Sequence, residues 1–159
     1  YLTAMGHHVA AAGQLASIGT WLGILSVPIS GLIVQRWISA KIFIPSTFLA
    51  GVAATCAIIW LEDPLIGFIA FGIFAWAPAG PIFALPVQVL NKANRAIGMG
   101  IFLSYYYLGI GVFPSVAGYL RDQSGDPAAP IIFAAWLLVG ALVMLVLFWV
   151  FEKVLQSKS

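Results

Sequence analysis

Charged residues are scarce in this sequence. Only 8% of its 159 residues are Asp, Glu, Lys or Arg, whereas 62% are hydrophobic. Soluble globular domains carry about 25% charged residues, so a soluble fold of this size could not cover its surface, and the chain is expected to lie in lipid. The net charge of +2 is too small for the basic patch by which proteins bind nucleic acid.

Cysteine is almost absent as well. Cys56 is the only one, so no disulfide can form within the chain and no cysteine metal cluster exists. We interpret it as a small apolar packing residue. His7 and His8 lack the further ligands that a metal site needs, and we interpret them as part of an external loop. Neither a metal nor a cofactor is expected.

Five long runs without charge follow one another, separated by short charged links. A bilayer core about 30 Å thick needs about 20 apolar residues in a helix, so each run can cross once and none can cross twice. The runs do not alternate apolar and polar residues as barrel strands do. The sequence therefore predicts an all-α, polytopic membrane protein with spans near residues 14–35, 42–61, 65–90, 96–120 and 130–151.

The charged links set an orientation. Six of the seven basic residues fall on one side of the predicted membrane, and they are Arg36, Lys41, Lys92, Arg95, Lys153 and Lys158. The excess of Lys and Arg in cytoplasmic loops makes that side cytoplasmic. The N-terminal end is then outside and the C-terminus cytoplasmic. Because the sequence begins with Tyr1 and not with Met, we interpret residues 1–159 as a fragment whose upstream part is missing.

Small residues recur at helical spacing in two of the spans, where they let membrane helices approach closely. Two interpretations stay open, namely static packing within the chain and a face that slides on a partner bundle. The first span carries Gly19, Gly23 and Gly31, and the fourth carries Gly100, Ser104, Gly111, Ser115 and Gly118.

The third span is interrupted near its midpoint. Trp76, Pro78 and Pro81 follow closely there, and each internal proline removes a backbone hydrogen bond. A broken helix in lipid is tolerated where protein or a water-filled cavity surrounds it, and such helices often mark transporter binding sites. The alternative is a packing kink without function.

The fourth span carries Tyr105, Tyr106 and Tyr107 near its midpoint. Consecutive residues fan around a helix, so Tyr107 lies closest to the small-residue stripe and Tyr106 points away from it into neighbouring helices or lipid. The alternative is buried packing with a local hydrogen bond. The predicted substrate-pathway residues are Tyr107, Tyr105, Ser104, Trp76, Pro78 and Pro81.

Carboxylate, lysine and arginine side chains are missing from the interior of every predicted span. Charges at membrane depth usually serve a function, so this chain offers no proton relay and no counter-ion for a charged solute. Ser26 and Ser104 have no histidine or aspartate within the spans to activate them. An integral membrane enzyme is therefore the weakest interpretation, and no catalytic residue is predicted.

Several segments resemble the major facilitator superfamily. Gly31, Gln35 and Arg36 resemble its Gly-x-Leu-x-Asp-Arg loop motif, with Gln35 in place of the acidic residue. Residues 109–125 resemble its penultimate helix and the external loop that follows. Residues 85–100 resemble its tenth helix passing into its eleventh. The chain is thus similar to the eighth to twelfth helices of a twelve-helix transporter.

The resemblance implies secondary active transport of a small solute by alternating access. It implies that the first and fourth spans face the other half of the transporter, that the third lines and gates the central cavity, and that the second and fifth give outer support. Expected partners are the bilayer, the missing N-terminal helices and the solute, in the cell (inner) membrane. The alternative is a non-transporting scaffold or subunit. The implied latch and inter-bundle packing residues are Gly31, Gln35, Arg36, Gly111, Pro114 and Gly118.

The five-span orientation predicts the result of a labelling experiment. Single cysteines introduced at Asp63 and at Ala93 should react with a membrane-impermeant thiol reagent from opposite faces of the membrane. Labelling of intact cells and of inverted vesicles distinguishes the two faces. Reaction of both positions from the same face would contradict the topology.

Overall fold

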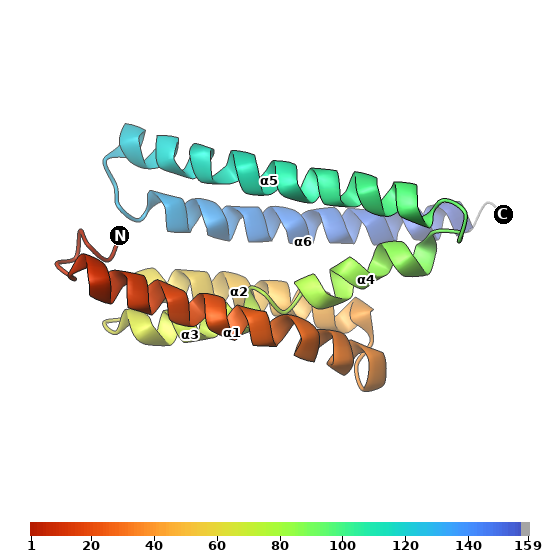
Figure 1. The fold of residues 1–159 in the computed structure, drawn as a ribbon, viewed down its shortest axis with the longest axis horizontal. Coiled ribbons are helices and arrows are strands. Elements are labelled where there is room, and N and C mark those ends of the chain that lie inside the picture. The colour runs from red at the N-terminus through yellow and green to blue at the C-terminus, as the bar shows by residue number, and fades with distance from the viewer. Residues whose placement is uncertain (157–159) are drawn as a thin grey trace.

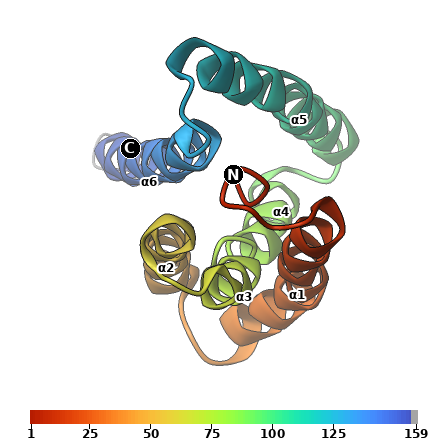
Figure 2. The same ribbon diagram turned by 90° about the vertical axis from the view of Figure 1, so that its left-hand side faces the viewer.

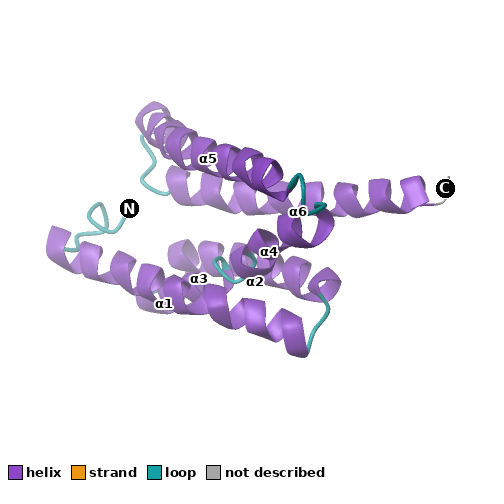
Figure 3. Cartoon of the chain, turned by 45° about the vertical axis from the view of Figure 1, so that its right-hand side comes forward, coloured by secondary structure: helices purple, strands orange, loops and turns teal. Residues whose placement is uncertain are grey.

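Six helices make up the part of the chain that the structure describes, which in this computed structural model is residues 1–156, with the side chains of residues 1–87 and 90–150. No strand occurs within residues 1–156, and the connections are short (Figure 3). The helices are α1 (Val9–Arg36), α2 (Ala40–Trp60), α3 (Pro64–Phe74), α4 (Ala79–Val89), α5 (Arg95–Ser124) and α6 (Ala129–Gln156).

Five segments of these helices are long and apolar enough to cross a membrane, with α3 and α4 together forming one span, Pro64–Val87. The predicted all-α fold with five spans is therefore confirmed. The predicted break in the third span is confirmed too, because α3 ends at Phe74 and α4 begins at Ala79. Lys158 lies outside the described residues, as does the side chain of Lys153.

The helix ends extend beyond several predicted bounds. Helix α1 begins at Val9 instead of residue 14, and α5 continues to Ser124 instead of residue 120. The prediction used the uncharged runs, whereas helices continue into polar segments until the backbone is capped. Gly125, with φ of 66°, ends α5 in the left-handed conformation that glycine tolerates. The Asp63 carboxylate accepts a hydrogen bond of 2.9 Å from the Leu65 amide at the start of α3.

The helices form an open bundle. Helices α1 and α2 pack on either side of α3, while α6 packs along α2, and α5 packs along α6 (Figure 1). Helix α4 connects the group formed by α1, α2 and α3 to the pair formed by α5 and α6. The N-terminal turn lies between these two groups at one end (Figure 2). Helix α2 supplies much of the buried apolar core, with Ile44 1% and Ile58 4% exposed, whereas no described residue of α5 is buried.

Close glycine contacts join α1 to the third span. A Cβ added at Gly23 would lie 2.6 Å from the Trp76 ring, and one added at Gly72 would lie 2.5 Å from the Gly19 carbonyl oxygen. These distances are shorter than real Cβ atoms tolerate, so only glycine allows this approach. Gly19 and Gly23 therefore pack against the third span of the same chain.

The fourth span differs. A Cβ added at Gly100, Gly111 or Gly118 would meet no atom within 4 Å in the described part of the chain. The small-residue stripe of α5 is thus open at these glycines, and no described helix packs against it there.

The close contacts predict how stability responds to one added methyl group. Gly72→Ala should lower the free energy of unfolding of the intact protein by about 1–3 kcal/mol, because the methyl group overpacks the α1–α3 contact. The matched control is Gly140→Ala on α6, where the added Cβ meets nothing within 4 Å. Denaturant titration of the purified protein in detergent measures both, and equal losses would contradict the packing assignment.

Candidate functional site

The break in the third span exposes backbone groups that a continuous helix would satisfy. Pro78 has no N–H to donate to the Phe74 carbonyl one turn earlier. At the preceding residue, the Ser26 hydroxyl of α1 donates a hydrogen bond of 2.6 Å to the Ile73 carbonyl oxygen. Because lipid supplies no donors, carbonyls at this depth need partners from protein or trapped water. The Ser26 hydroxyl therefore ties the break to α1.

The surroundings of the break are tightly packed. Ala77, at 5% exposure, and Pro78 are buried. A Cβ added at Gly51 of α2 would lie 3.1 Å from the Ala75 Cα. Gly80, at the start of α4, lies directly against the Val27 carbonyl of α1. The break is thus enclosed by α1 on one side and α2 on the other.

The three pathway residues predicted at the break take different positions. Pro78 and Pro81 are buried, so they shape the backbone and do not line an open surface. Trp76 is 37% exposed, with its ring over Gly23. Of these three residues, Trp76 is therefore the one whose side chain reaches an open surface.

An aromatic cluster joins α4 to α5. The Phe83 ring of α4 lies edge-to-face with Phe102 and Tyr106 of α5, at centroid distances of 5.4 and 5.1 Å. Tyr106 lies edge-to-face with Tyr107 at 5.4 Å. Tyr106 thus points into a neighbouring helix, as the fan of the helix predicted.

Two of the tyrosines stand on the open surface of α5. Tyr105 and Tyr107 are 72% and 65% exposed. An open hollow of about 470 Å³ lies beside Tyr105, lined by Tyr105, Tyr106, Gly109, Ile110, Phe113 and Pro114. Sequence reasoning missed Phe83 and Phe102. The spacing of Phe102 and Tyr106, four residues apart on one helix face, was the available signal for one of them.

The remaining predicted site residues are mostly exposed. The Ser104 hydroxyl is satisfied within its own helix by the Gly100 carbonyl at 2.9 Å. Gln35 and Arg36 are exposed at the end of α1, and a Cβ added at Gly31 would meet nothing within 4 Å. Gly111, Pro114 and Gly118 are exposed on α5. The structure leaves all of these residues accessible to helices outside this chain.

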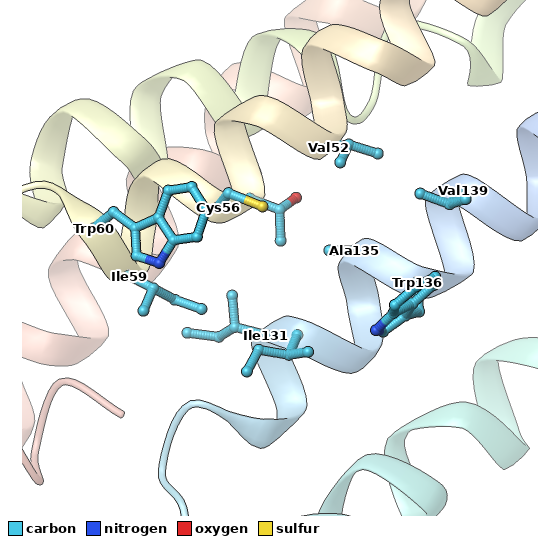
Figure 4. Close-up of a pocket in the computed structure, with 10 residues that line it drawn as sticks. Val52, Cys56, Ile59, Trp60, Ile131, Ala135, Trp136 and Val139 are labelled. Carbon is cyan, nitrogen blue, oxygen red and sulfur yellow. The ribbon is translucent and has the colours of Figure 1, made fainter.

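A groove between α2 and α6 has few polar groups that could bind a ligand. It has a volume of about 360 Å³ and is lined mainly by apolar side chains, among them Ile59, Trp60 and Val139 (Figure 4). The Thr55 hydroxyl in its wall already bonds the Gly51 carbonyl at 2.7 Å. Cys56 lies in the same wall, in the apolar setting expected of a packing residue. Across the described residues, no group of His, Cys, Asp and Glu side chains is placed to hold a metal ion.

Comparison with known proteins gives two matches. The family model described as Major Facilitator Superfamily matches residues 1–158. The multidrug export protein EmrB of Haemophilus influenzae is 30% identical over 123 residues, which cover 70% of this chain and 24% of that protein. The chain thus spans about a quarter of the length of this relative. No solved structure matches.

The hydrogen bond at the break can be tested by removing its donor. Ser26→Ala should lower the free energy of unfolding of the intact protein by about 1 kcal/mol, because the Ile73 carbonyl loses a partner from another helix. Ser46→Ala is the matched control, since the Ser46 hydroxyl bonds the Ile42 carbonyl of its own helix at 2.7 Å. Denaturant titration compares the two, and an equal effect would contradict the tie between α1 and the break.

Proposed function

The chain belongs to the Major Facilitator Superfamily, and from this premise we propose that it is part of a secondary active transporter that carries a small solute across the membrane by alternating access. The observation that carries the proposal is the break between α3 and α4 within a single membrane span. A plain membrane anchor has no need of such a break, because it costs backbone hydrogen bonds in lipid.

The break divides the third span into a fixed half and a movable half. Helix α3 packs along both α1 and α2, with glycine contacts at Gly67 and Gly72. Helix α4 packs less extensively on its two neighbours, contacting α1 through Gly80 and α5 through Phe83. Rotation at residues 75–78 would therefore tilt α4 and the attached face of α5 while α3 stays in place.

The open face of α5 is the proposed contact with the rest of the transporter. Its small-residue stripe includes Gly111 and Gly118, where an added Cβ would meet nothing in the described chain. Such stripes allow close helix approach, and we assign this one to the missing N-terminal helices. Gly31, Gln35 and Arg36 would form a latch between the halves at the cytoplasmic end of α1.

The proposed setting follows from the charge pattern of the links. The N-terminal end would lie outside the cell (inner) membrane and the C-terminus in the cytoplasm, because the basic links gather on one side. The spans carry no Asp, Glu, Lys or Arg in their interior, which supports neutral or weakly polar contacts between this chain and the solute. The relative's name describes export of drugs, and on that likeness we propose a small organic solute.

Transport assays test whether Tyr107 and the break at Pro78 belong to the pathway of the solute. Tyr107→Phe and Pro78→Ala in the intact protein should each lower transport by about fivefold. The first removes a hydrogen bond from the Tyr107 hydroxyl to the solute, and the second allows the helix to continue through the break. Leu142→Ala on α6 is the control and should leave transport nearly unchanged.

The assay uses proteoliposomes and a radiolabelled small solute that the wild-type protein is first shown to move. Expression and reconstitution are matched between variants. Unimpaired transport by all three variants would overturn the assignment of these residues to the pathway.

A further inference from the structure

We propose that a groove between α1 and α2 binds an anionic phospholipid of the cytoplasmic leaflet, with one acyl chain in the groove and the phosphate group on Arg36. The inference goes beyond the proposed transport function and does not depend on it. It uses the proposed orientation only to say in which leaflet the lipid lies. It draws on the position of the groove, on its walls, on its length and on the charge at its mouth.

The groove lies where α1 and α2 pack on either side of α3 and meet each other little (Figure 2). It has a volume of about 400 Å³, and Ile73, Phe74 and Ala77 at the break in the third span form its floor. At about 100° per residue, Gly31 lies about 180° around α1 from the groove residue Leu22. Gly31 belongs to the face assigned to the N-terminal helices, so the groove opens on the opposite side of α1, toward lipid.

The walls of the groove suit an apolar occupant. Three hydroxyls line it, from Ser26, Ser30 and Thr47, and each donates a hydrogen bond to a backbone carbonyl oxygen, at 2.6, 2.7 and 2.9 Å. The other side chains that line it are apolar, and those of Leu25 and Ile29 are 60% and 52% exposed. A hydrophilic ligand would lose its hydrogen bonds to water and find no free hydroxyl here. An acyl chain needs no hydrogen bond.

The groove is about as long as one leaflet is thick. Its residues on α1 run from Leu22 to Ile33, which at a rise of 1.5 Å per residue is about 16 Å. Half of a hydrocarbon core about 30 Å thick is about 15 Å. On α2 the groove begins at Phe43, close to the helix start at Ala40. It therefore runs from the cytoplasmic end of the spans to the middle of the bilayer, and one acyl chain of that leaflet can lie along its full length.

Positive charge lies at the mouth of the groove. Arg36 follows Ile33 by three residues and Ile29 by seven, so it continues their stripe of α1. Among the described residues, the Arg36 side chain makes no ion pair or hydrogen bond. Lys41 adds charge to the same link, and residues 1–61 contain no Asp or Glu. Basic residues at the cytoplasmic surface attract anionic lipids. A guanidinium has five donors, so a bound phosphate leaves donors for the proposed latch.

Photocrosslinking of the intact protein in lipid nanodiscs tests the proposal. The probe is phosphatidylglycerol with a diazirine on one acyl chain, and the comparison is phosphatidylcholine with the same chain. Peptide mass spectrometry maps the crosslinks. We expect phosphatidylglycerol to label Leu25, Ile29 and Phe74 more than Leu49, which is a similarly exposed side chain of α2 outside the groove, at 59%. Phosphatidylcholine should label the groove about fivefold less, because its headgroup carries no net charge.

Two variants separate the charge from the groove. Arg36→Gln should lower the phosphatidylglycerol signal in the groove about fivefold, which is the effect of one basic residue beside an anionic lipid. Arg95→Gln is the matched control, since it removes a basic residue from the next cytoplasmic link and should change this signal little. Ile29→Trp fills the groove and should abolish labelling of Leu25 and Phe74 by both lipids. Leu49→Trp, its control on the outer face of α2, should leave that labelling unchanged.

Three results would overturn the lipid site. These are equal labelling of the groove by the two lipids, equal effects of Arg36→Gln and Arg95→Gln, and labelling of the groove no stronger than that of Leu49, including the case in which upstream helices cover the groove. Solute transport is measured separately, so each of these results leaves the transport proposal standing. Labelling of a cysteine at Asp63 from the cytoplasmic face would overturn the leaflet assignment.

Discussion

In a bilayer the backbone finds no water to bond with, so each N–H and C=O group must be satisfied by the protein, and this requirement governs the rest of the structure. It restricts the chain to helices and makes every interruption costly. The interruption at residues 75–78 persists because α1 supplies the Ser26 hydroxyl to the Ile73 carbonyl at 2.6 Å. It persists also because α1 and α2 enclose the break, with Gly23 under the Trp76 ring and Gly51 against Ala75.

Packing in this chain depends on backbone approach more than on burial of large side chains. Lipid is as apolar as leucine, so burial of leucine adds little between membrane helices, and glycine contacts become the means of association. Helix α3 therefore meets its neighbours through Gly67 and Gly72. Helix α5 carries an equivalent stripe whose glycines meet nothing in the described chain. The same residue type thus marks a closed interface on one helix and an open one on another.

This difference explains how far the sequence could be used for prediction. The five spans and the break depend on charge spacing and proline, which are local properties, and both predictions are confirmed. The direction in which each glycine stripe faces could not be predicted, because the helices are apolar on all sides and give no periodic signal. The observed helix ends differ from the predicted ones because the prediction stopped at the first charged residue. Helix α5 continues past that point through polar residues to Ser124. Phe83 was missed because its partners lie on another helix.

The two halves of the third span meet different surroundings, and this asymmetry connects the fold to the proposed transport cycle. Helix α3 packs on α1 and α2 through glycine contacts at Gly67 and Gly72. Helix α4 has one such contact, at Gly80 against α1, and meets α5 through the rings of Phe83, Phe102 and Tyr106. Ring contacts can slide and re-form with little loss, because edge-to-face and offset arrangements differ little in energy. Glycine contacts are lost as soon as the backbones separate. Motion at the break would therefore pass to the ring contacts between Phe83 of α4 and the aromatic residues Phe102 and Tyr106 of α5.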